Sequence, residues 1–160
     1  MTITIGKKIS AFKSLSTGGE ISLSTFKGKR LILFFYPKDN TPGCTQETAD
    51  FRDASGTLAD SNVVIIGISR DSIKSHENFK AKLELPFELI SDPDEILCEQ
   101  FGVMKMKNMY GKQVRGIERS TFLIDTDGKL LQEWRGVKVP NHVVAVLLAV
   151  AKISSSNLAN

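Results

Sequence analysis

A chain of 160 residues suits one domain, and its 41% hydrophobic and 24% charged residues exclude a disordered protein. The formal net charge is only +3, because 21 basic residues are interleaved with 18 acidic ones, so no basic block predicts a nucleic-acid partner. No apolar run approaches the ~20 residues that span a bilayer, and we expect no membrane partner.

The N-terminal segment and the cysteine content both predict a cytoplasmic protein. Residues 1–8, MTITIGKK, place alternating apolar residues before the lysines, which is the reverse of a secretory signal peptide. Two cysteines, Cys44 and Cys98, are too few for a disulfide-stapled secreted scaffold. In a reducing compartment either thiol is free to react.

The first half of the chain alternates between strand and helix patterns. Residues 17–20, TGGE, predict a turn within an N-terminal extension. The apolar runs RLILFFY at 30–36 and VVIIGI at 63–68 predict two strands buried on both faces. Pro37 ends the first of them, and a loop of turn-forming residues leads into a helix over 43–60.

The second half continues this alternation. The expected elements are, in chain order, a helix capped by Asp71 or Ser72, a short strand over 87–90, a helix with Asp92 as its N-cap and Gly102 at its end, two strands over 120–124 and 129–134, and a helix beginning at Asn141. Asp127 and Gly128 join the two later strands as a hairpin, because an Asp-Gly pair favours a tight turn.

This order of elements predicts an α/β fold. We expect a central mixed β-sheet with helices on both faces, formed by a single domain over 1–153. Residues 154–160 are polar and are expected to form a frayed tail. The residues over 105–116 are expected to be a loop that lines a substrate pocket.

Cys44 lies where the first buried strand, its loop and the following helix meet. The start of a helix presents unpaired N–H groups and the positive end of the helix dipole, which favour a thiolate over a thiol. Pro42 and Gly43 allow a tight turn, and Thr41 offers a hydroxyl to the sulfur or to an approaching oxygen. An inert core cysteine is the alternative, but the preceding TPG loop favours a reactive thiol.

Residues 36–45, YPKDNTPGCT, resemble the PxxxTxxC signature of the peroxiredoxins, and they are most similar to the bacterioferritin comigratory protein, or peroxiredoxin Q, group. The resemblance continues through QETADFRD at 46–53, GISRDS at 67–72, SDPD at 91–94 and IERSTFLID at 117–125. It implies a thioredoxin-like fold and a thiol-dependent peroxidase that reduces hydrogen peroxide and organic hydroperoxides. It implies neither a cofactor nor a metal ion.

The resemblance also implies roles for five residues. Cys44 corresponds to the peroxidatic cysteine, which cycles through sulfenic acid, while Pro37 and Thr41 shape its loop. Arg119 corresponds to the arginine that closes the pocket, and an acid at the position of Glu47 often orients that arginine. Negative charge moves from sulfur to the departing oxygen during attack on the O–O bond, so a fixed guanidinium stabilises the transition state.

The pattern departs from the family where the sulfenic acid has to be reduced. Many members carry a resolving cysteine five residues after the first, where this chain has Ala49, and others carry it near residues 79–81, which hold no cysteine. We expect Cys98 to face the core. The expected mechanism is therefore of the one-cysteine type, with thioredoxin, glutaredoxin or glutathione as the reducing partner of a monomer or weak dimer.

Other functions are less well supported. A thioredoxin-type reductase would need C-x-x-C, which residues 43–47, GCTQE, do not contain. A catalytically weak redox-sensing or binding module on the same fold is the alternative, favoured by the missing resolving cysteine. Nucleic-acid binding has only the pI near 8.9 in its favour. His76 and His142 match no metal-ligand pattern, and we expect both to be solvated or capping residues.

Overall fold

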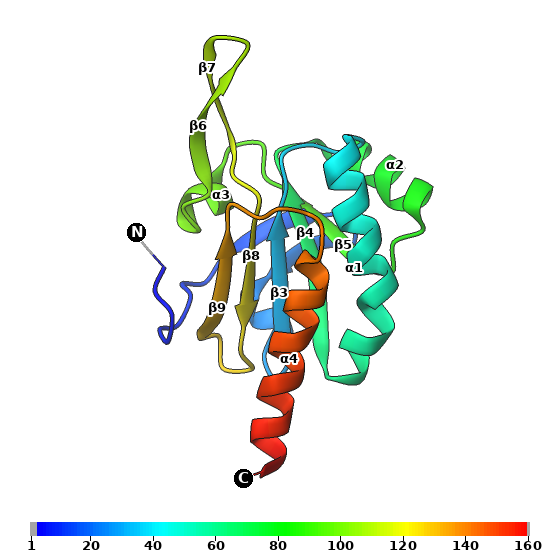
Figure 1. The fold of residues 1–160 in the computed structure, drawn as a ribbon, viewed down its shortest axis with the longest axis vertical. Coiled ribbons are helices and arrows are strands. Elements are labelled where there is room, and N and C mark those ends of the chain that lie inside the picture. Colours follow the sequence, from blue (N-terminus) through cyan, green and yellow to red (C-terminus); the bar gives the residue numbers. More distant parts are fainter. Residues whose placement is uncertain (1–2, 160) are drawn as a thin grey trace.

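The computed structural model describes residues 3–159, which form one large sheet, a separate hairpin and the helices around them (Figure 1). The large sheet has the strand order β2-β1-β5-β4-β3-β8-β9. Its strands are β1 (Lys13–Ser16), β2 (Gly19–Ser22), β3 (Arg30–Phe35), β4 (Val63–Ser69), β5 (Glu88–Ser91), β8 (Ser120–Ile124) and β9 (Leu130–Arg135). The expected mixed sheet is confirmed, because β3, β4 and β5 run parallel while β1–β2, β3–β8 and β8–β9 are antiparallel.

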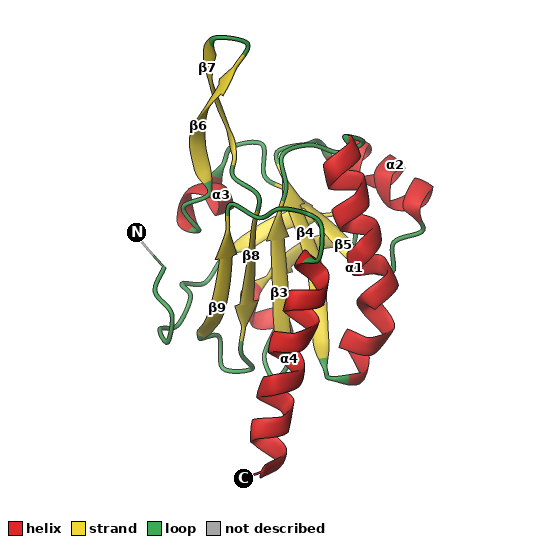
Figure 2. Ribbon diagram, viewed as in Figure 1, coloured by secondary structure: helices red, strands yellow, loops and turns green. Residues whose placement is uncertain are grey.

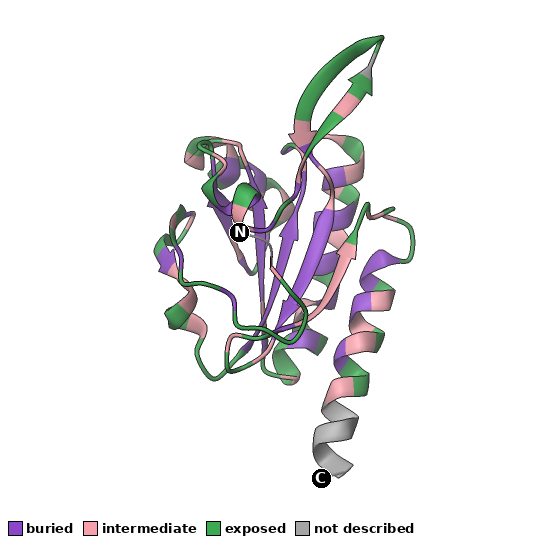
Figure 3. Cartoon of the chain, turned by 90° about the vertical axis from the view of Figure 1, so that its left-hand side faces the viewer, coloured by how far each residue is buried: buried purple, intermediate pink, exposed green. Residues whose placement is uncertain are grey.

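The central strand β3 is buried along its whole length, as its apolar run predicts. Its neighbour β4 pairs Gly67 with Phe34, and a side chain at Gly67 would bring a Cβ within 2.8 Å of the Phe34 ring. The glycine therefore makes room for the phenylalanine in the core. Figure 3 shows the central strands of the sheet buried through the body of the molecule.

Alternate residues of β3 supply two separate cores, one on each face of the sheet. Leu31, Leu33 and Phe35 belong to one core, and Ile32 and Phe34 to the other. Figure 2 shows the helices of the second face in front of the sheet. That face is covered by α1 (Pro42–Asp60), α2 (Ile73–Leu83) and α4 (His142–Ala159), whereas the short α3 (Ile96–Gln100) and the N-terminal segment cover the opposite face.

The short helix α3 begins later than the sequence patterns predict. The prediction that Asp92 is its N-cap was wrong, because Glu95 adopts a left-handed φ of 62° and the helix begins at Ile96. Asp92 still stabilises the helix start, since its carboxylate accepts hydrogen bonds from the N–H groups of Leu97 at 3.2 Å and Cys98 at 2.8 Å.

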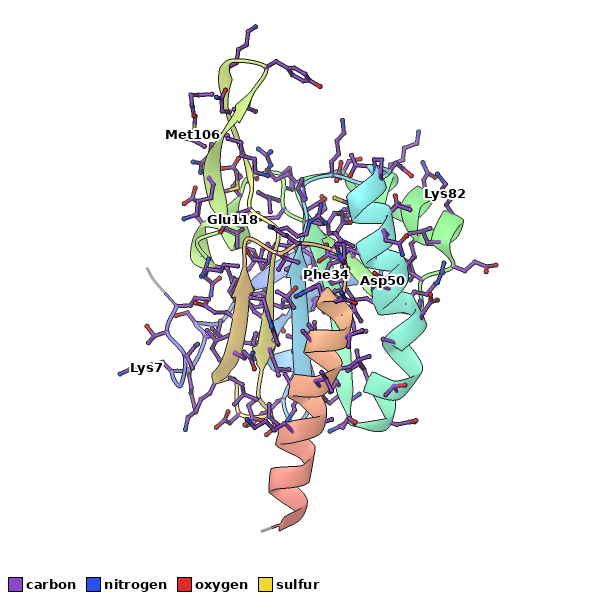
Figure 4. All side chains as sticks on the ribbon, in the orientation of Figure 1. Lys7, Phe34, Asp50, Lys82, Met106 and Glu118 are labelled. Carbon is purple, nitrogen blue, oxygen red and sulfur yellow. The ribbon has the colours of Figure 1, made fainter. Side chains whose placement is uncertain are left out.

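The segment expected to be a pocket loop is a hairpin. Strands β6 (Met104–Met109) and β7 (Lys112–Ile117) pair with each other and project away from the sheet (Figure 1). Tyr110 and Gly111 form the turn with φ values of 54° and 79°, which suit a tight hairpin. Figure 4 shows Met106 on this projection and Glu118 where the hairpin meets the body.

The last helix, α4, runs from His142 through Ala159. Its backbone is thus helical across residues 154–159, where the sequence predicts a frayed polar tail. The boundary between the domain and such a tail stays a prediction. Within residues 3–159, no helix combines the length and apolar character needed to cross a membrane.

Candidate active site

The loop between β3 and α1 delivers Cys44 to the first turn of a helix. Thr41 is the N-cap with extended backbone angles, Pro42 is the first helical residue, and Cys44 is the third. The N–H groups of Gly43 and Cys44 therefore lack acceptors within the helix and face its start. Cys44 is only 1% exposed, so its sulfur lies in a site largely shielded from water.

Arg119 reaches the same end of the sheet because of the way two strands pair. Strand β8 is antiparallel to β3, with Ser120 opposite Phe35, so the residue before β8 lies beside the loop that follows β3. Arg119 Nη2 donates to Cys44 Sγ at 3.4 Å, and Nη1 donates to Glu47 Oε1 at 2.7 Å. Cys44 and Glu47 share one face of α1, which allows a single guanidinium to contact both.

The charges of Glu47 and Arg119 depend on each other. Burial raises the pKa of Glu47 to about 7, although Arg119 acts in the opposite direction. Burial would lower the pKa of Arg119, but Glu47 and Cys44 together raise it above its usual value, so the guanidinium stays charged. Within the described part of the chain, Oε2 of Glu47 is buried without a hydrogen-bond partner.

The two remaining predicted site residues lie in the loop before the helix. The Thr41 hydroxyl donates to the Lys38 carbonyl at 2.8 Å, so its proton is used within the loop and its oxygen remains able to accept. Pro37 follows β3 after one intervening residue, Tyr36, and has no N–H with which to extend the strand. The structure thus brings Cys44, Arg119 and Glu47 together, with Thr41 three residues before the sulfur.

The chain resembles known proteins over most of its length. The AhpC/TSA family model matches residues 5–133. A putative peroxiredoxin bcp of Coxiella burnetii is 51% identical over 148 residues, covering 92% of this chain and 98% of that protein. Peroxiredoxin Bcp of Bacillus subtilis is 49% identical over 155 residues, covering 96% and 99%. The chain belongs to the AhpC/TSA family.

It is a peroxiredoxin of the bacterioferritin comigratory protein, or peroxiredoxin Q, group, and therefore a thiol-dependent peroxidase with a thioredoxin-like fold. A solved structure of the Xanthomonas campestris bacterioferritin comigratory protein, described through its alkyl peroxide reduction activity, superimposes with a TM-score of 0.85 at 48% identity. The match covers 89% of this chain and 92% of that one.

Sequence reasoning missed two basic residues near the site of this peroxiredoxin. Lys107, from the hairpin, donates to the Ile117 carbonyl, and its pKa is lowered by burial and by Arg119 while Cys44 acts in the opposite direction. His142 lies 2.7 Å from the Thr121 hydroxyl through Nε2. Burial, with a contribution from Arg119, lowers the pKa of His142 to about 4, so the ring is neutral.

The expectation that both histidines are solvated or capping was wrong. His76 is fully buried and His142 is only 6% exposed. Each contacts groups that are distant in the sequence, His142 through Thr121 and His76 through Asp39, and a single-sequence pattern carries no signal for such pairs.

One group of side chains has the composition of a metal site. Asp39, Asp71 and His76 each bring a potential ligand atom within 4.8 Å of the others. These atoms bind protein groups instead, since His76 Nδ1 lies 2.7 Å from Asp39 and Asp71 accepts from the Asp39 N–H at 2.9 Å. The arrangement is that of a hydrogen-bonded network, in which metal binding would have to displace existing partners.

The second cysteine of this peroxiredoxin lies on the other side of the sheet. Cys98 belongs to the core beneath α3, whereas Cys44 belongs to the core beneath α1. Burial, together with the nearby Asp92 carboxylate, raises the pKa of Cys98 far above its usual range and favours the unreactive thiol. A disulfide between the two would require the chain to rearrange, because the sheet separates them.

Proposed function

We propose that Cys44 is the peroxidatic cysteine of this peroxiredoxin and that Arg119 stabilises the charge that moves during the reaction. The observation that carries the proposal is the 3.4 Å separation of Cys44 Sγ and Arg119 Nη2 at the start of α1. A guanidinium at this distance, beside the positive end of a helix, stabilises negative charge on the sulfur and on the oxygen that receives it during attack.

The reaction is an in-line attack of the Cys44 thiolate on the hydroperoxide. A sulfur–oxygen bond forms while the O–O bond breaks, so Cys44–S⁻ and ROOH give Cys44–SOH and RO⁻, which takes up a proton and leaves as ROH. Negative charge passes from the sulfur to the departing oxygen. The Arg119 guanidinium and the free N–H groups of the helix start are already in place to stabilise it.

The other three predicted site residues position these groups. Glu47 fixes the guanidinium of Arg119 through its 2.7 Å ion pair, which limits the orientations that the donor can adopt. The hydroxyl oxygen of Thr41, three residues before Cys44, remains able to accept a hydrogen bond. Pro37 restricts the backbone where the chain leaves β3.

We further propose hydrogen peroxide and organic hydroperoxides as substrates, in line with the alkyl peroxide reduction described for the Xanthomonas campestris relative. An external thiol then attacks the sulfur of Cys44–SOH, giving a mixed disulfide and water. A second thiol attacks the reductant's sulfur in that mixed disulfide, which releases Cys44 and leaves the reductant as a disulfide. Thioredoxin, glutaredoxin and glutathione are the candidate reductants. The burial of Cys98 on the opposite face of the sheet supports this one-cysteine scheme.

The cellular compartment and the oligomeric state are also proposals. Both cysteines are free, which supports a reducing compartment, and we place the enzyme in the cytoplasm. No step of the scheme requires a second subunit, so a monomer or weak dimer is sufficient.

Peroxide consumption in the presence of dithiothreitol tests the proposed role of Cys44. The wild type and a Cys98→Ser variant should consume hydrogen peroxide at similar rates, and a Cys44→Ser variant should be inactive. If the wild type and Cys44→Ser were equally inert, the protein would instead be a binding or redox-sensing module on the same fold.

A further inference from the structure

Asp39 is a carboxylate buried in the loop between β3 and α1, five residues before Cys44. It is only 4% exposed. A charge removed from water is costly unless it is paired and hydrogen-bonded, so its position depends on the groups around it.

Those groups tie the loop to the start of α2. The Asp39 carboxylate accepts from the Tyr36 hydroxyl at 2.6 Å and from the Ser75 hydroxyl at 2.8 Å, and its Oδ2 lies 2.7 Å from His76 Nδ1. The backbone N–H of Asp39 donates to Asp71 at 2.9 Å. Although burial opposes ionisation, the hydrogen bonds from His76 and Tyr36 hold the pKa of Asp39 below its usual value.

The second ring nitrogen of His76 links the same ring to β5. Nε2 lies 2.9 Å from the carbonyl oxygen of Ile90 on β5, and a carbonyl only accepts hydrogen bonds. Both ring nitrogens are therefore engaged, Nδ1 by the loop and Nε2 by the β5 backbone. Asp39 and His76 form a buried hydrogen-bonded pair between the loop and α2.

The same loop determines the position of Cys44. The Thr41 hydroxyl donates to Lys38, and the Thr41 carbonyl accepts from the N–H of Thr45 at 2.8 Å, so the loop and the first turn of α1 are joined. Cys44 is 1% exposed in this arrangement. A protein thiol therefore cannot contact a sulfur at this position until the loop or the helix start moves.

We propose that Tyr36, Asp39 and His76 are positioning residues that clamp the loop and hold Cys44 against Arg119. This inference rests on the proposed function. The clamp favours the arrangement that reacts with peroxide, and its release exposes the sulfenic acid to the reducing thiol. Weakening the clamp shifts the population toward the released state, so the two half-reactions change in opposite directions.

Rapid mixing separates the half-reactions. Reduced protein is mixed with one equivalent of hydrogen peroxide to measure sulfenic acid formation, and the preformed sulfenic acid is mixed with reduced thioredoxin to measure its reduction. For Asp39→Asn and His76→Phe, we expect the first rate to fall by about tenfold, because a small misplacement of reacting groups is costly. The second rate should rise several-fold.

Two further variants keep the test decisive. Tyr36→Phe removes one hydrogen bond without changing a charge, so it should move both rates in the same directions by smaller factors, even if the other variants fold poorly. Ile124→Val reduces a buried side chain at the far end of β3, where Ile124 pairs with Leu31, and should leave both rates unchanged.

Rates in the clamp variants that both fall together, or that both match the wild type, would overturn the inference. Failure of the proposed function would look different, because the wild type itself would form no sulfenic acid on Cys44.

Discussion

The Arg119 guanidinium lies 3.4 Å from the Cys44 sulfur, although 75 residues separate them in the chain. The contact is made by the antiparallel pairing of β3 and β8, which brings the start of one strand beside the loop that leaves the other. Arg119 also donates to Glu47, so the orientation of its guanidinium is fixed by contacts with both Glu47 and Cys44. A fixed donor stabilises developing charge better than a mobile one.

Replacing Arg119 by lysine tests the two-sided contact. The charge is kept, but a single ammonium group cannot reproduce the fork that joins the sulfur to Glu47. We expect the rate of sulfenic acid formation to fall about 10²-fold, as for the loss of other fixed donors to a developing charge. Arg52→Lys, at a residue of α1 whose guanidinium donates to the Leu83 carbonyl at the end of α2, is the control and should react like the wild type.

A matched pair of glycine substitutions in α1 tests how closely the guanidinium fits. A Cβ at Gly43 would lie 3.2 Å from Arg119 Nη2 and would displace it, so Gly43→Ala should slow the peroxide step by about tenfold. Among the described residues, nothing lies within 4 Å of a Cβ at Gly56. Gly56→Ala should stabilise the helix by about 0.5–1 kcal/mol in urea unfolding and leave the rate unchanged. Equal rates in the two variants would contradict the fit.

The buried Glu47 predicts a particular pH dependence of stability. Its folded pKa is raised to about 7, so between its usual value and pH 7 the folded state holds a proton that the unfolded state has lost. Stability therefore falls as pH rises through this interval and levels off above it. Relative to Glu47→Gln, the wild type should lose on the order of 2 kcal/mol between pH 5 and 8.

Urea unfolding of both proteins at each pH measures this difference. Comparison with Glu47→Gln is needed because His142 acts with the opposite sign. Its pKa is lowered to about 4, so its contribution to stability is present above pH 6.5 and is lost as the pH falls. A wild type and a variant with parallel pH profiles would show that Glu47 does not titrate in this range.

Much of the sheet could be predicted because its signals are local. The run over 31–35 is apolar without interruption, which is typical of a short strand buried on both faces. Cys44 could be singled out in the same way, from the turn residues before it. The family resemblance, and not the periodicity, pointed to Arg119.

The parts that could not be predicted depend on distant partners. His76 is buried because it pairs with Asp39, which lies 37 residues away, and its own helix offers no indication of that contact. The hairpin over 104–117 begins with an alternating Met-Lys pattern, but most of it faces solvent, so no buried apolar run marks its strands. α3 began late because a left-handed Glu95 interrupted a plausible cap.

The separation of the two cysteines predicts how the oxidised protein behaves. Cys98→Ala should leave peroxide turnover unchanged and cost roughly 1 kcal/mol of stability, because it only shortens a buried side chain. Peroxide treatment of the wild type without a reductant should give no Cys44–Cys98 disulfide in peptide mass spectra. A good yield of that disulfide would show that the chain can rearrange to bring the two cysteines together. It would rule out the one-cysteine scheme.

The most direct test of the role of Cys44 is to locate the sulfenic acid after one reaction with peroxide. Reduced protein is mixed with one equivalent of hydrogen peroxide in the presence of dimedone, and the labelled peptides are identified by mass spectrometry. A peroxidatic Cys44 should carry the label in the wild type and in Cys98→Ala, and Cys44→Ser should carry none. Label on Cys98, or peroxide consumption that survives in Cys44→Ser, would contradict this role of Cys44.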